Sequence, residues 1–417
     1  MLGLTAPLAQ VVSAQGKDDG SLYSRYGLGE LHTFASSRAQ ALGGGGTALY
    51  SYDYLNFGNP AAWSRQALVR VAAGVQFDGL RAQDATGSSE RLLRGAFNAL
   101  QIGFPLFSQR LGLGVSFEPY SRVDYEVTAP GSLEVSGRDP LAYEVQHAGS
   151  GGLHQIRAGL GWRSVPWLSL GGSVDFLFGI TELSERTTFA SADVVETNLL
   201  SSTRLHGTTL TGGILLAMGP PAGELTFAAS GTLPVKIKGS RTRTLGESLD
   251  RDTLGAQVRG TVELPASLRS GAAFKWQNRW LFAADLRYEP WTQASSTLPL
   301  SGFASSHLHD RLRIGGGVEW IPAGTSLLES YFARVAYRLG FYRDNLYVSP
   351  VVGTDIAVTA ITGGLGLPTL FAGTRLDLVF EAGVRGTTEQ NLVRDHFIGI
   401  SATLNIGERW FLKRRLR

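Results

Sequence analysis

The sequence contains no cysteine, which excludes a disulfide framework and any thiolate metal site. It also contains no run of about 18 apolar residues, so it is not expected to cross a membrane as a helix. Neither sign of charge dominates, because 38 basic residues stand against 35 acidic ones. This balance gives no indication of a nucleic-acid partner.

The chain is rich in glycine, with 53 residues, and from about residue 67 onward apolar and polar side chains alternate. In residues 311–320, Leu312, Ile314 and Trp320 fall on one face of an extended strand. Arg313 and Glu319 fall on the other face. A soluble sandwich also alternates in this way, so the argument rests on the repetition of the pattern and on the loop lengths.

About fourteen alternating segments follow one another, joined by connections that are alternately long and short. The predicted strands are 67–77, 94–105, 111–125, 154–163, 167–180, 205–218, 224–238, 258–276, 280–291, 310–321, 329–342, 354–367, 374–385 and 396–411. Bacterial outer-membrane barrels have this rhythm, with short turns and both termini in the periplasm. We therefore predict an all-β protein, a transmembrane antiparallel β-barrel of about 14 strands, in contact with outer-membrane lipid and lipopolysaccharide.

Charged side chains of both signs occupy the face opposite the apolar one. On the lipid face, one such charge would cost roughly 2–4 kcal/mol at the midplane of the membrane, so we expect these charges to face the lumen. The predicted lumen charges are Asp285, Arg287, Arg313, Glu319, Arg334, Arg338, Asp377 and Glu381. Tryptophans near strand ends predict interfacial girdles, and these are Trp162, Trp167, Trp276, Trp280, Trp291, Trp320 and Trp410.

Two short regions flank the alternating part. Residues 1–14 end in Ser13-Ala14 after an apolar stretch, which is typical of a secretory-signal remnant. Residues 15–66 do not alternate and are expected to form an N-terminal periplasmic or hatch segment, followed by the barrel over 67–411. The basic tail 412–417 suits either a contact with an acidic periplasmic partner or a solvated stop at the membrane edge.

Several stretches resemble the FadL-like outer-membrane β-barrel family (FadL/TodX type). Residues 38–49, with their run of small residues, and the Asn-Pro-Ala motif at 59–62 resemble the family's N-terminal hatch, and 263–274 resembles a second family block. Residues 21–30, 363–368, 385–387 and 410–414 are similar to a Bacteroidota-type subgroup. The resemblance implies a fourteen-stranded barrel whose lumen holds the hatch.

The hatch assignment also has a physical reason, because a barrel of this width leaks unless its lumen is filled. The predicted hatch residues are Gly43, Gly44, Gly45, Gly46, Asn59 and Pro60. Glycines permit close backbone approach and proline makes a rigid turn. The same glycines do not suit a phosphate loop, because no Lys-Ser/Thr pair follows them and no strand–loop–helix pattern surrounds them.

The resemblance implies passive uptake of hydrophobic, fatty-acid-like molecules through hatch movement. The alternative is a non-transporting structural subunit of an outer-membrane complex, in protein secretion or barrel assembly, with other outer-membrane or periplasmic proteins as partners. Ligand-binding residues are not identified, although Phe341, Leu346 and Tyr347 lie near a long loop.

We expect neither an enzyme nor a cofactor. The 7 histidines are scattered, and none lies in a nucleophile motif. His307 and His309 with Asp310 suit either a metal site or a polar loop surface, and we expect the polar surface.

Overall fold

The structure is a computed structural model that describes residues 20–51, 54–107, 109–134, 140–191, 193–219, 223–246, 252–369, 371 and 373–408. The expected signal remnant (1–14), the basic tail (412–417) and Trp410 lie outside these residues. Among the residues that it describes, no helix is both long and apolar enough to span a membrane.

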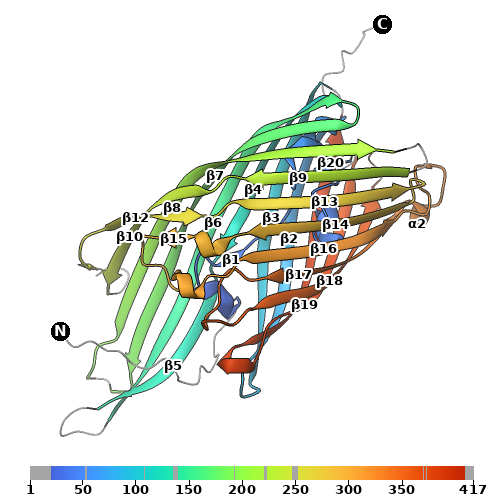
Figure 1. The fold of residues 1–417 in the computed structure, drawn as a ribbon. Helices are drawn as coiled ribbons and strands as arrows, with labels where there is room; N and C mark the ends of the chain where they lie inside the picture. Colours follow the sequence, from blue (N-terminus) through green and yellow to red (C-terminus); the bar gives the residue numbers. More distant parts are fainter. Residues whose placement is uncertain are drawn as a thin grey trace.

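The β-strands form one antiparallel sheet that closes on itself (Figure 1), because β2 pairs with β20 on one side and with β3 on the other. Three barrel strands are each divided into two pieces, β4 with β5, β9 with β10, and β12 with β13. Three further strands, β1, β11 and β15, are two-residue additions. The result is a closed barrel of 14 strands, as the sequence predicts.

The strands of the first half are β1 (Glu30–Leu31), β2 (Val69–Gln83), β3 (Ser89–Phe107), β4 (Leu111–Arg122), β5 (Tyr125–Leu133), β6 (Leu141–Val165), β7 (Leu168–Phe189), β8 (Thr197–Met218), β9 (Gly223–Thr232) and β10 (Val235–Leu245). The second half contains β11 (Asp252–Thr253), β12 (Val258–Leu264), β13 (Ser267–Trp276), β14 (Trp280–Glu289), β15 (Ser295–Ser296), β16 (Arg311–Trp320), β17 (Ala336–Asn345), β18 (Ala357–Pro368), β19 (Arg375–Gly386) and β20 (Arg394–Glu408). The helices are η1 (Leu22–Arg25), α1 (Ser37–Ala41), η2 (Pro60–Arg65), η3 (Trp291–Gln293), η4 (Ser305–His307), α2 (Tyr331–Arg334) and η5 (Glu389–Asn391).

Two of the divided strands are broken at proline. Pro234 separates β9 from β10, and Pro265 follows directly after β12. Proline has no backbone N–H to donate to a neighbouring strand, so it interrupts the ladder where it stands. The continuous strands predicted over 224–238 and 258–276 are therefore each two shorter strands.

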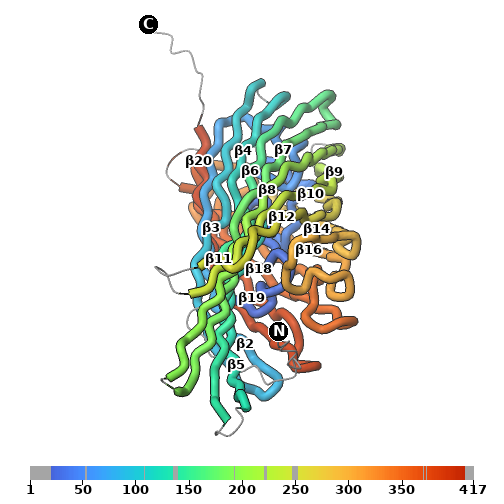
Figure 2. The backbone as a smooth tube through the Cα atoms, turned by 90° about the vertical axis from the view of Figure 1, so that its left-hand side faces the viewer, coloured from blue at the N-terminus to red at the C-terminus, as the bar shows by residue number. Residues whose placement is uncertain are grey.

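The two ends of the barrel differ. At the long-loop end β2 joins β3, β5 joins β6, β7 joins β8 and β19 joins β20, while the other end, the short-turn end, carries turns such as 166–167 and 277–279. Much of the predicted loops 126–153 and 181–203 is in fact strand, so that β5–β8 reach farther than their neighbours (Figure 2). Apart from an inner cluster that includes Tyr125, Val127 and Leu183, these extensions are mostly polar, so they lack the apolar outer face by which the sequence marks membrane strands.

The outer surface carries an apolar band. On β20, Ile398, Ile400, Leu404 and Ile406 all point outward and are exposed. Near the short-turn end Trp276, Trp280, Trp320 and Tyr337 are paired in order across four strands, and the Trp280 and Trp320 ring centroids are 5.7 Å apart. Aromatic side chains at this level are typical of a membrane interface.

Trp291 does not belong to this girdle, and its prediction is wrong. The strand expected to reach residue 291 ends at Glu289, and Trp291 begins η3 with 1% of its surface exposed. Its ring packs 4.2 Å from the Tyr347 ring. Pro290 ends the strand, and the Trp291 side chain that follows it points into the barrel.

Candidate functional site: the lumen and its N-terminal segment

Residues 20–66, apart from 52 and 53, form the N-terminal segment, which lies within the ring of strands (Figure 1). It begins with η1, pairs β1 with the edge of β4 beyond the ladder between β3 and β4, through the pair Glu30↔Arg122, and continues through α1 and η2. Leu28, Leu42, Phe57 and Trp63 along it are fully buried. The hydrophobic core of the molecule is therefore largely the contact between this segment and the inner wall.

One part of this contact is made of backbone against backbone. The helix η2 lies on five inward-facing wall glycines, here named the glycine seat, Gly112, Gly114, Gly161, Gly171 and Gly213. A Cβ atom at Gly112 would lie 2.0 Å from the Trp63 carbonyl oxygen, and one at Gly171 would lie 2.4 Å from the Ala61 nitrogen. No side chain fits at these positions while η2 stays in place.

Asn59 and Pro60 set the start of η2 on this seat. The Asn59 side chain accepts a hydrogen bond from the Ala61 backbone N–H (2.9 Å), and it donates to the Ile214 carbonyl oxygen of β8 (2.9 Å). Pro60 occupies the first helical position, where a missing N–H costs nothing. The Asn-Pro pair is thus both a helix start and an attachment to the wall.

The glycine run after α1 makes a second close contact. Gly43 has a φ of +70°, and a Cβ added to it would meet the Phe341 carbonyl oxygen at 2.2 Å. The Gly43 N–H donates to the Thr362 hydroxyl (3.0 Å), which donates in turn to the Ala41 carbonyl (2.9 Å). A few residues on, Gly46 N–H (2.7 Å) and Thr47 N–H (2.6 Å) both donate to the Asp285 carboxylate of β14.

The other face of α1 is held by charge, at a cluster named here the arginine seat: Arg38, Tyr54, Glu319, Arg338 and Asp377. Arg38 and Arg338 both donate to the Glu319 carboxylate, at 2.9 and 2.8 Å. Arg338 also donates to Asp377 (2.6 Å) and to the Tyr54 hydroxyl (2.6 Å). The Arg338 and Asp377 side chains are fully buried, so the segment and three wall strands share one network of buried ion pairs.

Two more networks lie toward the long-loop end. Glu30 of β1 pairs with Arg385 and with Arg94 (3.2 Å), and Arg94 also pairs with Asp78 (2.9 Å). In the second, Arg311 pairs with Asp344 (2.6 Å) and Glu289 (3.3 Å), and it donates to the Thr33 hydroxyl of the segment (3.0 Å). The segment is thus tied to strands all round the barrel.

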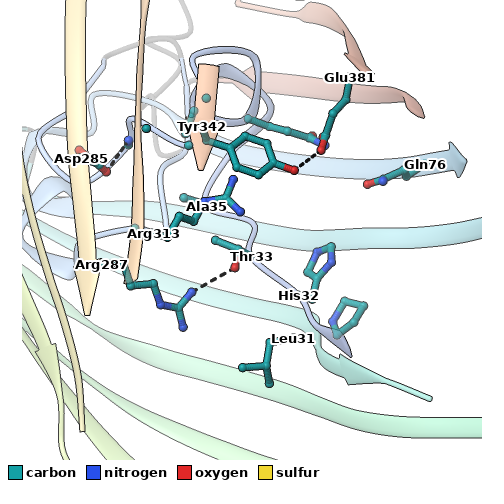
Figure 3. Close-up of a pocket in the computed structure, with 18 of the residues that line it drawn as sticks. Leu31, His32, Thr33, Ala35, Gln76, Asp285, Arg287, Arg313, Tyr342 and Glu381 are labelled. Carbon is teal, nitrogen blue, oxygen red and sulfur yellow. Dashed lines mark hydrogen bonds between the residues drawn. The ribbon is translucent and has the colours of Figure 1, made fainter. Parts of the chain in front are cut away.

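A cavity of about 180 Å³ remains between segment and wall (Figure 3). Its lining is mixed, with slightly more apolar than polar surface, and its polar side chains include Arg287, Arg313, Tyr342, Glu381 and His32. Tyr342 donates to the Glu381 carboxylate, and the Arg313 guanidinium lies 3.7 Å from the Tyr342 ring centroid. Burial lowers the pKa of His32 to about 4, so this imidazole is neutral at physiological pH. A charged, hydrogen-bonding cavity of this size is suited to water or small polar groups.

Of the predicted lumen charges, Asp285, Glu319, Arg338 and Asp377 bind the segment or its network, and Arg313 and Glu381 line the cavity. Arg287 pairs with Glu289 (2.5 Å). Arg334 lies elsewhere. The strand predicted to begin at 329 begins at Ala336, so Arg334 belongs to α2 in the preceding turn, and its carbonyl accepts a hydrogen bond from Arg375.

The residues of the barrel wall that contact the N-terminal segment were not identified from the sequence. The glycines of the wall strands carry a signal, since Gly171 and Gly213 stand at inward positions where a strand ordinarily has a side chain. Tyr347 was considered near a ligand path, but its hydroxyl donates to the Gly29 carbonyl (2.8 Å) and accepts from the Leu28 N–H (2.8 Å). Phe341 faces outward and is exposed.

The three loop residues considered for a metal have separate partners. His307 Nδ1 lies 2.9 Å from the Ser349 carbonyl oxygen, and His309 pairs with Asp355 (2.9 Å). Asp310 accepts from Tyr288 (2.6 Å). In the described part of the chain, no group of three His, Cys, Asp or Glu side chains is placed to hold a metal ion.

Several solved structures share this architecture, and two of them are described as toluene transporters. The toluene transporter TbuX of Ralstonia pickettii matches with a TM-score of 0.58 at 14% identity, over 91% of this chain and 99% of that one. A FadL homologue of Pseudomonas aeruginosa matches with a TM-score of 0.56 at 11% identity, over 90% and 98% of the two chains. The Pseudomonas putida toluene transporter TodX matches with a TM-score of 0.54 at 14% identity, over 92% and 100%.

At this identity the likeness extends to the fold, which is that of outer-membrane FadL-type barrels. No curated protein matches the chain. The BamG family model matches residues 2–417, and the chain therefore belongs to the BamG family.

Proposed function

We propose that this barrel is a non-transporting structural subunit of an outer-membrane protein complex, with the N-terminal segment as a fixed plug. The observation that carries the proposal is the way the segment is held. Arg338, buried in the wall, joins the segment's Tyr54 to Glu319 and Asp377. Moving the segment would separate its Arg38 from Glu319 and its Glu30 from Arg94. Breaking one buried ion pair typically costs about 3–5 kcal/mol.

The character of the lumen supports the same function. A site for a fatty-acid-like molecule is expected to be mostly apolar and at least about 300 Å³ in volume. The cavity beside the segment is smaller, about 180 Å³, and it is lined by Arg287, Arg313 and Glu381. An apolar chain placed there would remove water from these charges and give them no partner in return.

Family membership fits a role in barrel assembly. The family that includes this chain, BamG, shares its name stem with the barrel-assembly machinery. Of the two complexes considered for a structural subunit, secretion and barrel assembly, we therefore favour assembly. The partners proposed are other outer-membrane or periplasmic proteins of that complex.

Exposed apolar side chains suggest where a partner binds. The turn between β16 and β17 carries Leu327, Leu328 (99% exposed) and Phe332, and Phe371 stands exposed in the turn between β18 and β19. Turns at the short-turn end, which we expect to face the periplasm, have no need of such side chains for the barrel itself. Grouped apolar residues of this kind mark contacts with proteins or with the membrane.

The test is affinity purification from the native outer membrane in mild detergent, followed by mass spectrometry of proteins and lipids. We expect stoichiometric protein partners that persist through washing. The double variant Leu328→Ser/Phe332→Ser is expected to lose them, whereas Val195→Ser, at an exposed apolar position of the long-loop end, is expected to keep them. A barrel that purifies alone would overturn the proposal.

The second candidate is passive uptake of hydrophobic molecules through hatch movement. It is favoured by the shared architecture with barrels described as toluene transporters. Uptake of radiolabelled toluene and of a long-chain fatty acid by cells with and without this chain separates the two functions. A transporter raises uptake when it is present, and a structural subunit leaves uptake unchanged.

A further inference from the structure

A row of basic side chains crosses the outer wall on the long-loop side. The residues of this row are paired from strand to strand in the order Arg343, Thr359, Val384, His396, Arg81 and Arg91. Arg343, His396, Arg81 and Arg91 all face outward and are exposed. We name these four residues the basic row. It marks the level at which the apolar band of the outer wall ends.

An apolar groove lies directly beside the basic row, toward the short-turn end. The next outward residues are paired in the order Phe341, Ile361, Ala382, Ile398, Gly79 and Leu93. Ile398 is 66% exposed and Leu93 is 77% exposed. These large side chains stand as ridges, while Ala382 and Gly79 between them leave a hollow.

The hollow is open and continuous with the basic row. Its volume is about 900 Å³, and Arg81, Arg91 and His396 line it together with the apolar residues. A Cβ atom added at Gly79 would make only ordinary contacts, 3.6 Å from the nearest Leu93 carbon, so glycine is not required there by packing of the wall. The absence of a side chain instead deepens the groove.

The arginines of the row have no acidic partner within the chain's described residues. Arg81 donates to the Ser89 hydroxyl (3.2 Å), and neither Arg81 nor Arg91 takes part in an ion pair in that part of the protein. This differs from the lumen, where Arg94, Arg311 and Arg338 each pair with two carboxylates. The outer row therefore offers positive charge to something outside the chain.

We propose that this surface is a binding site for a phosphate-bearing, acylated lipid of the membrane leaflet at the long-loop end. The headgroup phosphate binds Arg81 and Arg91, and an acyl chain lies in the groove over Gly79 between Ile398 and Leu93. Arginine is suited to this because its guanidinium forms paired, charge-assisted hydrogen bonds with phosphate. The basic row suits the phosphate headgroup and the apolar groove beside it suits the acyl chain, so the surface matches both parts of one lipid.

The position of the site favours a lipid over a protein. The groove lies within the apolar band that faces the membrane, and the basic row lies at its edge, where headgroups stand. A protein docked on the band would need to cover neighbouring ridges such as Phe77, which is exposed beyond the groove. The positive charge is confined to the basic row. This agrees with a lipid leaflet, in which the phosphate headgroups form a single layer.

Native mass spectrometry of the full chain, titrated with bisphosphorylated lipid A, tests the site. We expect Arg81→Gln/Arg91→Gln to weaken lipid binding about tenfold or more, since each arginine near a membrane surface contributes about fivefold. Gly79→Leu, which fills the groove, is expected to weaken binding while leaving the charges in place. Arg204→Gln/Arg259→Gln removes two exposed arginines elsewhere on the barrel and is expected to change nothing.

Folding is checked for each variant by the heat-dependent gel mobility of the barrel. Equal binding of lipid A by wild type and Arg81→Gln/Arg91→Gln, or equal binding of dephosphorylated lipid A by wild type, would overturn the proposal. A photo-crosslinker placed at Leu93 in the native membrane gives an independent readout. Crosslinks to lipid support the site, and a crosslink to a protein in place of lipid would contradict it.

Discussion

The N-terminal segment meets the barrel wall in two different ways. At the glycine seat, η2 lies on glycines such as Gly112 and Gly171, and backbone atoms fill the space that side chains would take. At the arginine seat, α1 is held by the ion pair between Arg38 and Glu319, and Tyr54 by a hydrogen bond from the buried Arg338. The first contact is sensitive to volume and the second to charge, so the two can be disrupted independently.

Removing charge from the arginine seat is expected to have the largest effect. Arg338→Ala leaves Glu319 partly paired and Asp377 without its arginine, and breaking a buried pair costs about 3–5 kcal/mol. We expect this loss in the free energy of unfolding, measured by denaturant titration of the purified barrel. Arg259→Ala, at an exposed position of β12, is the control and is expected to remain near wild type.

Adding volume to the glycine seat is expected to come next. Gly171→Val places a side chain where the Ala61 nitrogen and the Pro60 carbonyl carbon lie 2.4 Å from the Cβ position. Overpacking of a core costs about 1–3 kcal/mol, and here η2 is expected to leave its seat. Trypsin cleavage at Arg65, which is buried in the intact protein, measures the displacement.

The control for this variant is its neighbour. Gly172 faces outward, and a Cβ atom there would meet its nearest neighbour, the Thr211 carbonyl oxygen, at 3.9 Å. Gly172→Val is expected to protect Arg65 as the wild type does. Equal cleavage of the two variants would mean that the glycine seat does not hold the segment.

Asn59 sharpens the comparison within the glycine seat. Asn59→Ala loses the cap on η2 and the hydrogen bond to the Ile214 carbonyl, and cap removal costs about 0.5–2 kcal/mol. Asn59→Ser keeps a side-chain oxygen for the cap and loses the bonds that the amide donates to the Ile214 and Ala229 carbonyls, so its loss of stability is expected to be smaller. Denaturant titration of both variants separates the two contributions, and equal losses would assign the whole effect to the bond with the wall.

The smallest effect is expected at Thr362, which lies between the two seats. Thr362→Val keeps the shape of the side chain and removes its hydrogen bonds to the Gly43 N–H and the Ala41 carbonyl. One net hydrogen bond contributes about 0.5–1.5 kcal/mol. A loss within this range is expected by the same titration, and no measurable loss would show that the glycine run is held by packing alone.

The sequence predicted the wall of this barrel better than its interior. Alternation marks a strand only where one face meets lipid, which is why Ile398 and Ile400 were placed correctly while the polar extension of β7 to Phe189 was taken for a loop. Trp291 was placed wrongly because aromatic residues near a strand end also occur in buried turns.

The interior depends on pairs of residues that are far apart in the sequence. The small-residue run at Gly43 and the motif at Asn59 indicated a segment that packs closely, but not the surface that receives it. Gly171 and Arg338 became part of the site only through the register of the strands that carry them. Asp285 and Arg338 could be assigned to the lumen from their face alone, whereas their partners could not.

The central claim is that the N-terminal segment stays fixed while the protein performs its function, and a disulfide lock tests it directly. Gly45→Cys/Ala283→Cys joins the segment to β14, because the Cβ positions are 3.3 Å apart, near the usual disulfide separation of about 3.5–4.5 Å. The chain has no other cysteine to interfere. Cells that carry only the oxidised, locked barrel are compared with cells that carry either single-cysteine variant.

We predict that the locked barrel retains its protein partners and supports growth as well as the single-cysteine controls do. Loss of growth, or loss of hydrophobic-compound uptake that returns when the disulfide is reduced, would contradict the account and show that the segment is a moving hatch.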